Sequence, residues 1–175
     1  SIKLQSNYNN ILKSIICGEL IHIDETTVKI RQERGYVWVI ANMTHVYYFF
    51  RPNRECDFLH KLLANFEGVL ISDFYGGYDS LPFRQQKCLI HLMRDINDLV
   101  LKNQNNLELK SIAESFGILL KNIVITIDKF GLKKRNLNKH KKDVNKFYKE
   151  VLSNKFTTDI AKKLTKRLIK NQRKL

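Results

Sequence analysis

The spacing of apolar residues changes once along this 175-residue chain, near residue 90, and this change limits the folds that it can adopt. Between residues 19 and 50, short segments rich in β-branched and aromatic residues alternate apolar and polar positions. A period of two is typical of strands that bury one face. From His91 onward, apolar residues recur every three or four positions, as in amphipathic helices. The sequence therefore predicts an α/β chain with a strand-rich first half and a helical second half.

The strand-rich half has the order of a mixed sheet. An antiparallel meander of three or four strands is predicted over 19–24, 26–31, 35–41 and 45–50. Asn53 is a suitable N-cap for a helix whose apolar residues run from Phe58 to Phe66. Residues 69–72 then form a continuously apolar strand of the kind buried on both faces, and 86–89 is predicted as one more short strand. A meander, a crossover helix and further strands match a ribonuclease-H-like mixed sheet, followed here by an all-helical basic segment.

The net charge of +14 lies entirely in the helical part of the chain. Residues 1–100 hold 11 basic and 11 acidic side chains, whereas residues 101–175 hold 20 and 6. A one-signed excess of this size favours a polyanionic partner, with nucleic acid first. The alternative is a lysine-rich composition that reflects an AT-rich genome. A basic run is predicted to contact phosphates, or else to be a solvated helix face; it comprises Lys133, Lys134, Arg135, Lys139, Lys141 and Lys142.

Several classes of protein are excluded by simpler features. No apolar run approaches the roughly 18 residues that a membrane-spanning helix needs, and the first residues are not a signal peptide. Three scattered cysteines are too few for a disulfide framework. We expect a cytoplasmic protein with no membrane partner. Because the sequence does not begin with Met, we also expect it to be a piece of a longer chain.

Two carboxylates follow apolar strand segments. Asp24 is predicted to close the first strand, and Asp73 closes the strand after the crossover helix. Ligands gather at strand ends in open α/β sheets, so adjacent strands would bring these carboxylates together. Two neighbouring carboxylates repel each other and are best neutralised by a hard divalent cation such as Mg²⁺. The alternative is that each Asp only caps a turn.

The sequence around these acids resembles one enzyme family. Four motifs occur in order over residues 20–98: HIDET (22–26), GYVWV (35–39), FEGVLISDFYGGY (66–78) and CLIHLMRD (88–95). Together they are similar to the catalytic core of DDE transposases from bacterial insertion sequences, and most of all to the insertion-sequence-sixty-six family. Members of that family carry DET after the first strand, GYxW on a following strand, GxLxSDxYxGY around the second acid and CxxHxxR at the start of a helical region.

The resemblance implies a ribonuclease-H-like enzyme that cuts DNA ends and joins them to a target with two Mg²⁺ ions, or with Mn²⁺. Asp24 and Asp73 would be the first and second catalytic, metal-binding carboxylates. His91 and Arg94 would face the active site or the DNA backbone. The implied partners are transposon ends and target DNA, with self-association in the DNA complex, in the bacterial nucleoid. Residues 1–98 would form the catalytic core, and residues 99–175 a basic helical insertion.

The family's third acid, a Glu on a late helix beyond the insertion, has no match. The three Glu residues that follow the Cys88–His91 motif all lie in the segment similar to the insertion: Glu108, Glu114 and Glu150. The sequence thus predicts an incomplete transposase core whose final catalytic helix is missing.

Other interpretations remain open at this point. The spacing of Cys88 and His91 could bind zinc or form a nucleophile pair, although no second ligand pair or orienting acid accompanies them. A non-enzymatic transposase remnant would bind DNA through its basic helices. A third hypothesis is another ribonuclease-H-like nuclease.

Overall fold

The computed structural model describes residues 2–175, with side chains from residue 4 onward. It divides into two compact units. The sheet unit contains residues up to Leu89 together with Lys174 and Leu175, and the helical unit contains Ile90–Arg173. The sequence-based division between residues 98 and 99 falls inside helix α3 (Leu89–Lys102). None of the described helices is long and apolar enough to cross a membrane.

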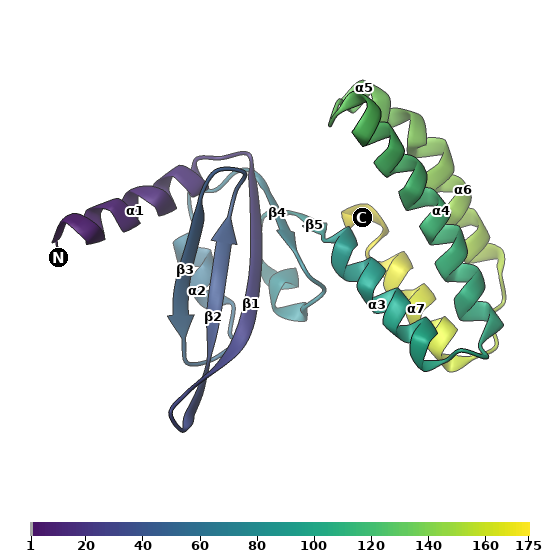
Figure 1. Ribbon diagram of the computed structural model, residues 1–175, viewed down its shortest axis with the longest axis horizontal. Coiled ribbons are helices and arrows are strands. Elements are labelled where there is room, and N and C mark those ends of the chain that lie inside the picture. The colour runs from purple at the N-terminus through teal and green to yellow at the C-terminus, as the bar shows by residue number, and fades with distance from the viewer. Residues whose placement is uncertain (1) are drawn as a thin grey trace. The chain divides into compact units, whose positions relative to one another are not determined.

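The sheet unit is built on one five-stranded mixed sheet, in the order β3-β2-β1-β4-β5 (Figure 1). Its first three strands form the predicted antiparallel meander, and β4 and β5 both run parallel to β1. Their bounds are β1 (Leu20–Ile30), β2 (Glu33–Ala41), β3 (Val46–Arg51), β4 (Val69–Ser72) and β5 (Arg84–Lys87). The mixed α/β architecture predicted from the sequence is therefore confirmed.

Strand β1 differs from the prediction in one respect that affects the site. Residues 20–30 form a single strand, so Asp24 lies inside β1 rather than at its end. The strand continues because its second half pairs with β2 as far as Ile30↔Glu33. Pairing with β4 extends only from Leu20 to His22. Asp24 therefore lies just past the stretch of β1 that is hydrogen-bonded on both edges.

One face of the sheet carries the apolar core. Trp38 is fully buried there among Ile21, Ile40, Leu59 and Leu70. Helices α1 (Ile2–Ile16) and α2 (Asp57–Leu62) cover this face, and the 3₁₀ helix η1 (Gly76–Ser80) adds the buried Tyr78. In Figure 1, α2 lies behind the strands of the meander. On the opposite face, outward-facing β3 residues such as Tyr48 and Phe50 are about half exposed.

Two helical predictions in this unit need correction. Helix α1 was missed, although Tyr8, Ile11, Leu12 and Ile15 recur at helical spacing and pack on the core. Helix α2 ends at Leu62 instead of near Phe66, and its N-cap is Cys56, without a side-chain cap, rather than Asn53.

The helical unit consists of amphipathic helices that pack through their apolar faces. After α3 the longer elements are α4 (Leu107–Phe130), α6 (Lys141–Ser153) and α7 (Asp159–Lys170). The short elements are α5 (Lys134–Leu137), η2 (Asn138–His140) and η3 (Gln172–Lys174). Phe116 of α4 meets Phe147 of α6 with ring centroids 5.7 Å apart, and α7 buries Leu164 and Leu168. Gly131 ends α4 with a φ of +71°, a conformation that glycine adopts readily.

Candidate functional site

The two predicted acids follow the paired segments of two neighbouring parallel strands. The register of β1 and β4 runs Leu20↔Val69, Ile21↔Leu70 and His22↔Ile71. Continued by two residues, this register places Asp24 opposite Asp73, which directly follows β4. Paired strands are about 4.8 Å apart, and the pairing of β1 with β4 ends at His22↔Ile71, two residues before the acids.

Backbone amides orient both carboxylates. The amide of Glu25 donates a 2.9 Å hydrogen bond to Asp24 Oδ1, and the amide of Tyr75 donates a 2.8 Å hydrogen bond to Asp73 Oδ1. Both side chains belong to residues that are partly buried. Oxygen donors of this kind are the ligands that Mg²⁺ and Mn²⁺ accept, so the donor set fits a divalent cation.

Successive residues of β1 point to opposite faces of the sheet. Ile21, Ile23 and Glu25 point to the covered face, where the Glu25 side chain is only 1% exposed. Asp24 therefore points to the other face, the one that carries the exposed side chains of β3. The strand thus separates a partly exposed acid from a buried one at adjacent positions.

The buried Glu25 belongs to a polar cluster that the sequence did not reveal. Its Oε1 lies 2.6 Å from Nε and 2.5 Å from Nη2 of Arg54, and its Oε2 accepts a hydrogen bond from the Tyr78 hydroxyl. Burial raises the pKa of Glu25 above its usual value, although the hydrogen bonds from Tyr78 and Arg54 act in the opposite direction. Burial and the hydrogen bond to Glu25 also raise the pKa of Tyr78.

A second buried charge lies on the same face, at the end of β5. The Lys87 side chain is 1% exposed, and its Nζ lies 3.3 Å from Asp79 Oδ1 and 3.4 Å from Ser72 Oγ. Burial lowers the pKa of Lys87, while the neighbouring Asp79 carboxylate raises it. Asp79 also pairs with Lys174 at 3.2 Å. This cluster is adjacent in sequence to Asp73 through Ser72, which donates to the Asp73 carbonyl at 3.0 Å.

The predicted basic run forms the connection between α4 and α6, at the end of that helix pair labelled α5 in Figure 1. All six predicted residues are exposed; we call them the hairpin-tip cations: Lys133, Lys134, Arg135, Lys139, Lys141 and Lys142. His140 connects the two sides of the tip. Its Nε2 lies 2.7 Å from Thr126 Oγ1 on α4, and its Nδ1 lies 3.1 Å from Asp143 Oδ2 on α6.

His91 and Arg94 lie one turn apart on α3, in the helical unit, with Arg94 exposed and His91 partly buried. Among residues with described side chains, no three His, Cys, Asp or Glu residues gather as a metal site.

The comparison with protein families decides the identification. The whole chain, residues 1–175, matches the family described as "Transposase IS66 family". The chain belongs to this transposase family. The resemblance identified from the four motifs is thereby confirmed, and family membership supports a role in transposition.

Other comparisons add little to this assignment. No curated protein matches the chain. A solved structure described as the simian T-cell lymphotropic virus intasome in complex with PP2A regulatory subunit B56 gamma matches at 12% identity and a TM-score of 0.35. The match covers 81% of this chain and 51% of that one, so the IS66-family chain spans about half the length of the solved chain.

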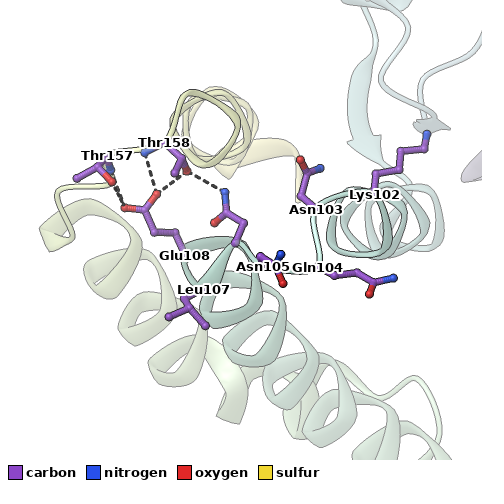
Figure 2. A pocket seen from close by; sticks show the side chains of 9 residues that line it. Lys102, Asn103, Gln104, Asn105, Leu107, Glu108, Thr157 and Thr158 are labelled. Carbon is purple, nitrogen blue, oxygen red and sulfur yellow. Dashed lines mark hydrogen bonds between the residues drawn. The ribbon is translucent and has the colours of Figure 1, made fainter.

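One Glu of the IS66-family chain connects the start of α4 to the residues that precede α7. Figure 2 shows Glu108 beside a shallow hollow at the start of α4, which has a volume of about 590 Å³ and is lined mainly by polar side chains, among them four amides. Its Oε1 accepts from the amide and hydroxyl of Thr157, and its Oε2 accepts from both groups of Thr158. These hydrogen bonds, the one from the Thr158 hydroxyl first, lower the pKa of Glu108 to about 2. Both oxygens of Glu108 thus hold the residues that precede α7.

Proposed function

We propose that the sheet unit carries two of the catalytic carboxylates of a DDE transposase, Asp24 and Asp73, on a ribonuclease-H-like sheet. The observation that supports the proposal is the parallel pairing of β1 with β4 from Leu20↔Val69 to His22↔Ile71; continued by two residues, this register would bring Asp24 and Asp73 to one level. The strand order β3-β2-β1-β4-β5, with three antiparallel strands followed by two parallel ones, is the order expected of such a sheet.

The proposed reaction is cleavage of DNA ends followed by their transfer to a target. Asp24 and Asp73 would hold divalent cations, whose chemistry would be to activate the attacking water or 3′-hydroxyl and to stabilise the leaving oxygen of the phosphodiester. The contribution of this chain is to supply oxygen ligands from Asp24 and Asp73 and to hold them by the amides of Glu25 and Tyr75.

We further propose that DNA is held by the basic helices, with residues 99–175 acting as the helical insertion. The hairpin-tip cations are exposed on a support that His140 fixes to both α4 and α6. His91 and Arg94 on α3 are proposed as further contacts to the DNA. The partners are transposon ends and target DNA, with self-association in that complex, in the bacterial cytoplasm at the nucleoid.

A second candidate function is DNA binding without catalysis. It is favoured by one observation: among residues with described side chains, no group of three metal-ligating side chains accompanies Asp24 and Asp73. In that case the chain would occupy DNA through its basic helices and interfere with intact transposase.

Binding of Mn²⁺, followed by electron paramagnetic resonance, tests the proposed site on the purified chain. We expect Asp24→Asn and Asp73→Asn each to weaken Mn²⁺ binding, because each removes a charged oxygen ligand. Asp128→Asn, at an exposed position of α4, is the matched control and should bind as the wild type does. Unchanged binding in Asp24→Asn would refute the site.

A nicking assay on plasmid DNA separates the two candidate functions. Mg²⁺-dependent nicking that Asp24→Asn abolishes supports catalysis. Salt-sensitive DNA binding without any nicking supports the second candidate.

A further inference from the structure

Residues from three separate segments meet around the buried carboxylate of Glu25. Arg54 follows β3, Tyr75 and Tyr78 follow β4, and Glu25 itself is in β1. The sequence separations are 29 residues to Arg54 and 53 to Tyr78. These side chains come together only in the folded chain, and their contacts attach the segment that follows β4 to β1.

Arg54 links Glu25 to the segment that carries Asp73. Its guanidinium carbon lies 4.0 Å from the centroid of the Tyr75 ring, and its carbonyl accepts a 3.1 Å hydrogen bond from the Tyr75 hydroxyl. The amide of the same Tyr75 donates to Asp73 Oδ1. Arg54 therefore holds Tyr75, and the amide of Tyr75 orients the Asp73 carboxylate.

Tyr78 provides a second attachment. It is fully buried, its ring packs edge-on against Tyr75 with centroids 5.6 Å apart, and its hydroxyl donates directly to Glu25. The segment 73–78 is thus fixed at two points to one carboxylate. Because Glu25 is the residue after Asp24, the same carboxylate also fixes β1 at the level of the other acid.

We propose that Glu25 is a positioning residue, which fixes the relative position of Asp24 and Asp73 through Arg54, Tyr75 and Tyr78. This inference rests on the proposed function, since it assigns to Glu25 an effect on the metal site formed by the two Asp residues. Glu25 does not itself reach that site, because it points to the covered face of the sheet. Its role is to hold β1 and the segment 73–78 in one geometry.

The environment of the cluster favours positioning over net stabilisation. The Glu25 carboxylate is buried, whereas the Arg54 side chain is 41% exposed. The cost of removing the carboxylate from water and the solvent screening of Arg54 therefore leave the pair only a modest net contribution to stability. The main effect of the cluster is on geometry. Because both oxygens of the Glu25 carboxylate have hydrogen-bond partners, the side chain and its partners can adopt few alternative arrangements. Groups that orient metal-binding side chains from outside the coordination sphere typically change metal affinity by about 10- to 100-fold when removed.

The test uses two variants of the complete chain and two measurements. Glu25→Gln keeps the shape of the side chain and removes its charge. Tyr75→Phe removes only the hydroxyl that donates to Arg54. Tyr148→Phe, which removes a buried tyrosine hydroxyl in the helical unit, is the matched control. Amide hydrogen exchange of residues 73–78 is measured without metal, and Mn²⁺ affinity is measured by electron paramagnetic resonance.

We expect Glu25→Gln to accelerate exchange across residues 73–78 and to weaken Mn²⁺ binding about 10-fold. Tyr75→Phe should change both readings in the same direction by less, and Tyr148→Phe should change neither. If Glu25→Gln does not fold, Tyr75→Phe decides by the same two readings.

Unchanged Mn²⁺ affinity in the folded variants would overturn the positioning role, whether or not exchange accelerates. The proposed function fails separately, and is recognised by a different result: Asp24→Asn would then bind Mn²⁺ as tightly as the wild type. In that case accelerated exchange in Glu25→Gln would show a structural attachment only, which also overturns the positioning of a metal site.

Discussion

Replacing four of the hairpin-tip cations should remove most of the salt dependence of DNA binding. The six residues are exposed, and each phosphate contact contributes about −0.9 to the slope of log affinity against log salt. Six contacts give a slope of about −5.4, which corresponds to a loss of about 2,000-fold in affinity between about 50 and 200 mM salt. A variant with Gln at Lys133, Lys134, Arg135 and Lys139 retains two of the hairpin-tip contacts, and these two contribute a slope of about −1.8 and a loss of about 12-fold.

The assay is fluorescence anisotropy of a labelled duplex, titrated at several salt concentrations. Gln is similar to Lys and Arg in helix propensity, so the variant should fold normally. The matched control changes the same number of charges on α7, with Gln at Lys162, Lys163, Lys166 and Lys170, all of them exposed. Its slope should remain near the wild-type value. If the α7 variant lost the slope and the hairpin-tip variant kept it, the assignment of the phosphate contacts to the hairpin tip would be refuted.

Three further predictions concern stability, each measured by urea unfolding. Gly68→Ala should destabilise the chain by about 1–3 kcal/mol, because a Cβ at this position would lie 2.3 Å from the carbonyl oxygen of Glu19. Gly117→Ala should instead stabilise the chain by about 1 kcal/mol, because a Cβ there would meet open space and alanine has the higher helix propensity. Lys87→Met should change the free energy of unfolding by less than about 1 kcal/mol, because it removes the cost of burying the ammonium group and leaves Asp79 paired with Lys174. A loss above about 3 kcal/mol would contradict this reasoning. The pKa of Glu108 is lower in the folded state than in the unfolded state. The contribution of Glu108 to the free energy of unfolding should therefore be complete above about pH 5 and be lost as the pH falls toward 2. Glu108→Gln should remove this part of the pH dependence of stability.

The strands were predictable because each is local. Alternation in 19–50 and the apolar run 69–72 set the meander and β4 without reference to distant residues. Helix α1 was missed because its asparagines have low helix propensity and obscure the apolar spacing from Tyr8 to Ile15. The sequence predicts two strands, 19–24 and 26–31, where the structure has β1, because the polar Asp24 and Glu25 indicate the end of the first one. Continuous pairing with β2 instead keeps residues 20–30 in a single strand.

The candidate site divides in the same way. Asp24 and Asp73 could be proposed from motifs and from their places after apolar segments. The cluster around Glu25 could not, because its partners are scattered over 53 residues and no periodic pattern connects them. The sequence likewise gives no sign that Lys87 is buried, since lysine is rarely found inside a protein.

Because side chains alternate along β1, the face to which each acid points depends on whether an odd or an even number of positions separates it from the core residues of the strand. Asp24 is one residue past the buried Ile23, and Glu25 is two. Inserting or deleting a single residue between them and the core would exchange the two acids between the faces of the sheet. The exposed position would then receive Glu and the buried position Asp, whose shorter side chain would not span to Arg54. Changes of two residues would keep each acid on its own face while moving both along the strand. Tolerance of length changes in this part of β1 should therefore follow parity rather than size.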